Sequence, residues 1–112
     1  MEGDPMTVRH ISRIDEIRKK ISERNYRLTL HARARMFERH ISTRDLVTLI
    51  NSGDIIEEYP DNEPCPAVLI LGFVTGRPCH AVVAHCEDHL RIITVYWPDE
   101  EKWINYSLRK SE

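Results

Sequence analysis

The sequence predicts an α+β fold with N-terminal helices, a four-stranded antiparallel sheet and a short C-terminal helix. Apolar residues recur at helical spacing as far as Gly53, and beyond it they alternate or run continuously, as in strands. Turn residues then divide the rest of the chain into short segments. With 112 residues, 41% of them hydrophobic, the chain has the size and composition of a single domain over 1–112. Residues 1–11 are expected to form a flexible segment ahead of it.

Three helices are expected before Gly53, each with a polar residue in the N-cap position. They cover about residues 13–23, about residues 30–40, and the segment between Ser42 and Gly53. The predicted N-caps are Ser12, Thr29 and Ser42, whose side-chain oxygens can accept from free N–H groups of the first turn. Asp45 follows Ser42 by three residues and completes a variant of the capping box.

Four strands and a final helix are expected after Gly53. The strands are residues 55–59, 67–74, 79–86 and 90–97, separated by a proline-rich loop, a turn at 75–78 and a turn at 87–89. Pro98 and Asp99 are expected to open the C-terminal helix, which contains Trp103 and Tyr106. Trp97 and Trp103 are assigned to packing of this helix.

Charge is distributed unevenly along the chain. Residues 1–44 contain 11 Arg and Lys against 6 Asp and Glu, whereas residues 45–112 contain 5 against 12, which gives the net charge of −2. This balance excludes a protein that coats nucleic acid through a wholly basic surface. It leaves open a local basic face on the helices, or helices whose charges are simply solvated.

The sequence indicates a cytoplasmic protein without cofactor or metal. It contains neither a run of about 18 apolar residues nor a signal peptide, so no membrane association is expected. Its three cysteines, Cys65, Cys79 and Cys86, are odd in number and widely spaced, which argues against a disulfide framework. Cys86 and His89 are close in sequence, but without a Cys-x-x-Cys pair a zinc site is not expected. No glycine-rich phosphate loop is present.

The second predicted helix carries a polar stripe of His31, Arg35 and Arg39, which recur every four residues. Guanidinium groups bind phosphate through paired donors, so this stripe can form a phosphate-binding edge. Alternatively, Glu38 and other acids pair with the arginines. Ala34 and Phe37 are expected to face the core.

The predicted hairpins bring a histidine and a tyrosine together. A tight turn at 87–89 places His80 opposite Tyr96 and Val82 opposite Thr94, and the turn at 75–78 places Phe73 beside His80. An ionisable histidine next to a tyrosine is a candidate for acid–base chemistry. The alternative is an ordinary, partly buried histidine that is hydrogen-bonded to the backbone.

Arg77 lies in the turn before His80. It can hold an anion at the same end of the sheet, or it can be a solvated turn residue.

Several segments resemble an uncharacterised bacterial family of the "domain of unknown function" type. They are Leu28–Met36, Arg39–Ser42, Gly53–Pro60, Gly72–His80 and Ile93–Tyr96. The pattern is also similar to the RelE/ParE superfamily and to the BrnT toxins. The resemblance implies a small cytoplasmic ribonuclease-like toxin of a bacterial or archaeal toxin–antitoxin system, whose partner is an antitoxin. RelE-type toxins are usually strongly basic, which this chain is not.

Two functions of different classes are therefore predicted. The first is a metal-independent endoribonuclease that acts on free or ribosome-bound RNA, because RNA supplies its own 2′-OH nucleophile. Its candidate residues are His80, Tyr96 and Arg39 for catalysis and His31, Arg35 and Arg77 for substrate binding. The second is a non-catalytic module on a RelE-like scaffold that binds a protein partner.

Overall fold

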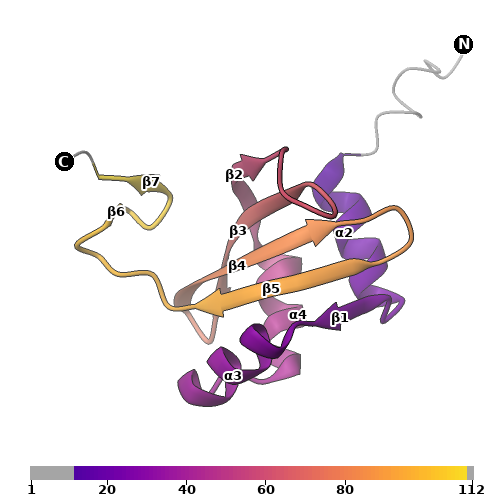
Figure 1. Ribbon diagram of the computed structural model, residues 1–112. Helices are drawn as coiled ribbons and strands as arrows, with labels where there is room; N and C mark the ends of the chain where they lie inside the picture. The colour runs from indigo at the N-terminus through magenta and orange to yellow at the C-terminus, as the bar shows by residue number, and fades with distance from the viewer. Residues whose placement is uncertain (1–11, 111–112) are drawn as a thin grey trace, which may run out of the picture.

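The computed structural model describes residues 12–110, so the segment expected at residues 1–11 lies outside the described residues. The fold is α+β, as predicted, and Figure 1 shows helices α2 and α4 behind the sheet. The helices are α2 (Arg13–Ser22), α3 (Leu30–Arg39) and α4 (Thr43–Ser52), and the strands are β1 (Tyr26–Leu28), β2 (Asp54–Tyr59), β3 (Ala67–Val74), β4 (Arg77–His85), β5 (Leu90–Tyr96), β6 (Trp103–Ile104) and β7 (Leu108–Arg109). None of the described helices is long and apolar enough to cross a membrane.

All three predicted N-caps are confirmed. The side chains of Ser12 and Thr29 accept hydrogen bonds from backbone N–H groups in the first turns of α2 and α3. Ser42 and Asp45 form the predicted capping box, each side chain accepting from the other residue's backbone N–H at 3.0 Å. These caps determine where the helices begin and thereby set the position of the stripe on α3.

The sheet has five strands and is mixed, which corrects the prediction of four antiparallel strands. Its strand order is β1-β5-β4-β3-β2, and β1 runs parallel to β5, with Tyr26 opposite Leu90 and Leu28 opposite Ile92. The strand has only three residues, so its sequence pattern is too short to be distinguished from a connection. Its partner is more than 60 positions away along the chain, and pairing at that distance leaves no local signal.

The registers of the two hairpins test the expected neighbours of His80. The β4–β5 register is confirmed, since His80 lies opposite Tyr96. The placement of Phe73 beside His80 is wrong, because Leu71 lies opposite His80 and Phe73 lies opposite Pro78. The turn before β4 contains only Thr75 and Gly76, and its two positive φ angles of 48° and 81° match the tight turns that connect hairpin strands.

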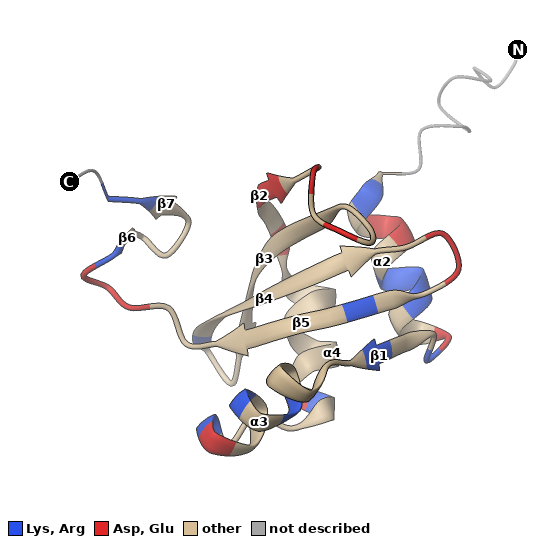
Figure 2. Cartoon of the chain, viewed as in Figure 1, with Lys and Arg blue, Asp and Glu red and all other residues tan. Residues whose placement is uncertain are grey.

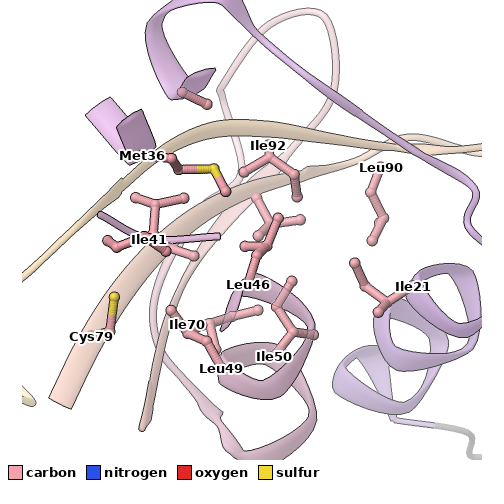
Figure 3. Packing of buried hydrophobic residues seen from close by; sticks show 14 of the residues in the cluster. Ile21, Met36, Ile41, Leu46, Leu49, Ile50, Ile70, Cys79, Leu90 and Ile92 are labelled. Atoms are coloured by element: carbon pink, nitrogen blue, oxygen red, sulfur yellow. The ribbon is translucent and has the colours of Figure 1, made fainter. Parts of the chain in front are cut away.

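The hydrophobic core lies between the helices and one face of the sheet. Figure 3 shows Leu46, Leu49 and Ile50 of α4 among core residues from the strands, and all three side chains are fully buried. Gly72 allows this close packing, because a Cβ at its position would lie 2.0 Å from the Leu49 carbonyl oxygen. Alternation along β4 and β5 then turns the other residues, including His80, to the opposite face.

The prediction of a C-terminal helix is wrong, because a small hairpin forms in its place. β6 and β7 pair antiparallel, with Trp103 opposite Arg109, and Figure 1 shows them beyond the end of the sheet at which β5 finishes. Asn105 and Tyr106 between them have positive φ values of 51° and 66°. An α-helix does not accommodate two consecutive residues with positive φ. The hairpin also buries the Trp103 side chain, which is 5% exposed.

A disulfide joins Cys65 and Cys86, contrary to the sequence prediction. The two cysteines extend the β3–β4 ladder, in which Ala67 lies opposite Ala84 and the His85 N–H donates to the Pro66 carbonyl. Their Cα atoms are therefore 5.2 Å apart, a normal disulfide spacing, although 21 positions separate them in sequence.

Candidate functional site

His80 is held by two hydrogen bonds on the sheet face opposite the helices. Its Nε2 lies 2.6 Å from the Tyr106 carbonyl oxygen and its Nδ1 lies 3.2 Å from the Tyr96 hydroxyl oxygen. Because a carbonyl can only accept, Nε2 carries the proton, and Nδ1 of the neutral ring accepts from the Tyr96 hydroxyl. The Trp103 ring meets the imidazole edge-on at 4.6 Å.

Burial determines which protonation states this pair adopts. His80 is 0% exposed, and loss of hydration lowers its pKa, although the Tyr106 carbonyl and the charge of Glu57 partly oppose that effect. Burial likewise raises the pKa of Tyr96 to about 12. At neutral pH His80 is therefore a neutral acceptor, and Tyr96 retains its proton.

His80 does not reach solvent, so it cannot contact a substrate in this arrangement. This agrees in part with the alternative predicted from the sequence, an ordinary, partly buried histidine that is hydrogen-bonded to the backbone. The additional bond to Tyr96 goes beyond that interpretation, because it orients a hydroxyl on the same sheet face. His80 is thus placed to position Tyr96 rather than to react itself.

A second polar group, which the sequence analysis missed, fastens the hairpin to the sheet. Arg109 of β7 donates two hydrogen bonds to the Glu57 carboxylate, at 2.7 and 3.1 Å, and the Tyr59 hydroxyl donates to the same carboxylate. Burial alone would raise the pKa of Glu57, but these bonds outweigh it and hold the pKa below its ordinary value. Arg109 also lies over the Trp103 ring, at 4.6 Å from its centroid.

The only sequence signal for this group was that Glu57 and Tyr59, two positions apart in a strand, share one sheet face. The predicted helix hid their partner, since in a helix Arg109 would not pair across from Trp103.

A cleft of ≈ 550 Å³ runs between α3, the end of β5 and the C-terminal hairpin. Its walls are His31, Arg35, Arg39, Thr94, Tyr96, Trp97, Asp99, Lys102, Trp103 and Arg109. Four of the six site residues proposed from the sequence therefore line one cleft: His31, Arg35, Arg39 and Tyr96. This cleft, defined by the ten residues above, is called the α3 cleft below.

The α3 cleft is predominantly basic. Two of its cations are neutralised, since Arg35 pairs with Glu38 at 3.2 Å, as the alternative interpretation of the stripe predicted, and Arg109 pairs with Glu57. Arg39 and Lys102 have no ion pair within residues 12–110. Asp99 is the acidic residue in the wall. The cleft therefore suits an anion, and Arg39 and Lys102 are its available cations.

Arg77 and His80 do not line the α3 cleft. The Arg77 guanidinium lies 3.9 Å from the centroid of the Trp97 ring, a cation–π arrangement. Trp97 is itself a wall residue and donates from Nε1 to the Arg39 carbonyl at 3.4 Å. Arg77 thus contacts a wall residue of the cleft without lining the cleft itself.

No group of three His, Cys, Asp or Glu side chains within residues 12–110 is arranged to hold a metal ion. Cys86 is committed to the disulfide, and His89 bonds to Asp88 at 2.7 Å. These residues therefore do not form a cluster of metal ligands.

The family comparison covers most of the described chain. A family model described as "Domain of unknown function (DUF4258)" matches residues 28–97, more than half of the sequence. The chain belongs to the DUF4258 family. The DUF4258 match includes α3, His80 and Tyr96 but ends before the C-terminal hairpin, and it gives no link to the RelE or BrnT toxins. Comparisons with curated proteins and with solved structures gave no match.

Proposed function

We propose that this DUF4258 protein is a toxin-like endoribonuclease that cleaves RNA by metal-independent acid–base chemistry in the α3 cleft. The observation that carries the proposal is the convergence of Tyr96, oriented by His80, with the basic stripe of α3 in one cleft. Phosphodiester cleavage at a 2′-OH requires a proton acceptor, a proton donor and cations around the phosphate. The cleft contains side chains for all three.

His31 is the proposed base, because it is the imidazole that lines the cleft. It takes the proton of the 2′-OH as the O2′–P bond forms. Tyr96 is the proposed acid: its single hydroxyl proton turns from His80 Nδ1 to O5′ and is transferred there as the P–O5′ bond breaks. The tyrosinate left behind regains a proton readily, because burial raises the pKa of Tyr96 to about 12. The products are a 2′,3′-cyclic phosphate and a 5′-hydroxyl.

The cations of the cleft stabilise the charge that develops on the phosphorane oxygens. Arg39 and Lys102 are available for this purpose without giving up an ion pair. Arg35 contributes after exchanging Glu38 for the phosphate, since that bond is at the exposed surface and is weak. His80 and Arg77 are positioning residues in this scheme, acting through Tyr96 and Trp97.

The toxin part of the proposal implies that expression arrests growth and that a protein antitoxin relieves it. The alternative function, a protein-binding module without catalysis, is favoured by a second hollow on the other side of α3. This hollow is lined by Arg24, Arg27, Arg33 and Arg44 and by none of the residues proposed for catalysis.

The proposal is tested by the cleavage of labelled single-stranded RNA in excess EDTA. Changing His31→Ala, Arg39→Ala or Tyr96→Phe should each lower turnover by about 10²-fold. Lys19→Ala removes a cation on α2 that is outside the cleft, and it should leave turnover unchanged. Equal cleavage by all four variants, or none by the unaltered protein, would contradict the proposal.

A further inference from the structure

A larger hollow of ≈ 1000 Å³ lies on the other side of α3 from the α3 cleft, between α2, β1, α3 and α4. Four arginines line it: Arg24, Arg27, Arg33 and Arg44. Arg33 lies two residues from both His31 and Arg35, about half a helical turn, so it projects from the opposite side of the helix. The hollow with these four arginines is called the arginine groove. Figure 2 shows the basic residues on β1 and α3.

The arginine groove is positively charged, and its lining contains no acidic residue. Within residues 12–110 none of its four arginines forms an ion pair, whereas Arg13, Arg18, Arg35 and Arg109 all do. Like charges gathered without acids repel one another, and an acidic ligand would remove that repulsion.

The floor of the groove is apolar. It includes Ile21, Leu28 and Val47. A shallow hollow beside it shares Leu28 with the groove and continues the apolar surface to Met36 and Phe37.

Two large apolar side chains stand exposed beside this floor. Leu30 and Phe37 are each 85% exposed, and Ala34 is exposed as well, so the prediction that Ala34 and Phe37 face the core is wrong; Ala32 and Met36 fill that role instead. Leu30 and Phe37 are seven residues apart, and therefore project from the same side of α3. Such a pair beside a groove marks a contact surface.

The edge of the sheet borders the same surface. β1 is the end strand and pairs only with β5 within the described sheet, so its outer backbone groups are available to another strand. Tyr26, Arg27 and Leu28 of this strand line the groove.

We propose that the arginine groove docks a segment of a partner protein that is acidic and carries apolar side chains. Carboxylates of this segment pair with the arginines, and its apolar side chains cover Leu30 and Phe37. RNA would use the arginines but not the apolar floor or the strand edge, so a protein segment accounts for more of the surface. This inference is independent of RNA cleavage.

The test measures binding by fluorescence anisotropy with three labelled probes. They are peptides of about 14 residues that alternate Glu with Leu or Glu with Ser, and a single-stranded RNA of about the same length. The Glu–Leu peptide should bind at least about tenfold more tightly than the other two. The double change Arg33→Glu/Arg44→Glu should weaken binding of the Glu–Leu peptide at least about tenfold.

Two further variants separate the contributions of charge and apolar contact. Lys19→Glu/Lys110→Glu makes the same change in net charge outside the groove and should leave binding unaltered. Phe37→Ser should weaken binding of the Glu–Leu peptide but not binding of the Glu–Ser peptide. All the replaced side chains are exposed, so circular dichroism should show that the variants fold.

Three outcomes would overturn the proposal. Tightest binding of RNA, lost in the Arg33→Glu/Arg44→Glu variant, would assign the groove to nucleic acid. A dimer in sedimentation that the same variant dissociates would assign it to a second copy of the chain. No binding of the Glu–Leu peptide at about 100 μM would show that the surface docks no such segment.

Discussion

At the scale of single residues, the neutral state of His80 links the site to stability. Its folded pKa lies below the ordinary value of 6.5 because the ring is buried. As pH falls through about 6.5, the unfolded chain gains a proton that the folded chain does not accept, so stability decreases. Above that pH both states are neutral and the contribution is fully present.

Urea unfolding should therefore show lower stability at pH 5.5 than at pH 7.5, and His80→Gln should reduce this difference. His85 is a second test of the same effect, because burial also lowers its pKa, although the nearby charge of Glu16 partly opposes that effect. His85→Gln should remove a separate part of the pH dependence. The same slope in the protein and in both variants would show that neither ring is held neutral by the fold.

Cys79 provides a second test at this scale. Burial raises the pKa of its thiol to about 12, and the thiol lies against the Tyr96 carbonyl oxygen. With Cys65 and Cys86 joined in a disulfide, the folded protein should contain no reactive thiol. Mass spectrometry after iodoacetamide treatment should show no label on folded protein and one label after unfolding without reductant. Labelling at Cys65 in the folded protein would contradict the disulfide.

At the scale of elements, the contact between α4 and β3 depends on Gly72. Gly72→Ala should destabilise the fold by more than about 2 kcal/mol, because the new Cβ would overlap backbone atoms of α4 that cannot move independently. Gly76→Ala is the comparison: its surroundings are open, and only its φ of +81° opposes the change. Urea unfolding should rank Gly72→Ala as the more damaging. The reverse order would show that α4 adjusts easily.

The C-terminal hairpin is the element most dependent on a few contacts. Trp103→Ala should remove its packing against His80 and loosen the segment, at a cost of about 3 kcal/mol. Trypsin should then cleave faster after Lys102 and Lys110, while Ile104→Ala, which changes a half-exposed neighbour, should have little effect. Unchanged cleavage in Trp103→Ala would mean that other contacts hold the hairpin.

Local patterns predicted the elements that carry their own signals. Caps and helical spacing were sufficient for α2, α3 and α4, and alternation or a continuous apolar run between turn residues was sufficient for β2 to β5. Two elements were missed because their stability comes from distant partners: β1 pairs with β5, and the C-terminal hairpin is tied to β2 by Arg109 and Glu57. The predicted turn at 75–78 was two residues longer than the turn at Thr75 and Gly76. The resulting error in register hid the alignment of Cys65 with Cys86.

At the scale of the whole molecule, the α3 cleft joins parts of the chain that the sequence keeps apart. The register of β4 and β5 predicted the contact of His80 with Tyr96, and helical spacing predicted the stripe. The burial of His80 was not predictable, because it depends on Trp103 and Tyr106 of the hairpin. The exposure of Phe37 was also missed, since the apolar residues of α3 fit two different faces of the helix as the buried face.

The most direct test of RNA cleavage in the α3 cleft is mass spectrometry of the products formed in EDTA from one RNA oligonucleotide. Attack by the 2′-OH should give fragments that end in a 2′,3′-cyclic phosphate and begin with a 5′-hydroxyl, and the all-2′-deoxy oligonucleotide should not be cleaved. Cleavage of the deoxy strand, 3′-hydroxyl products, or an intact RNA would contradict the proposal.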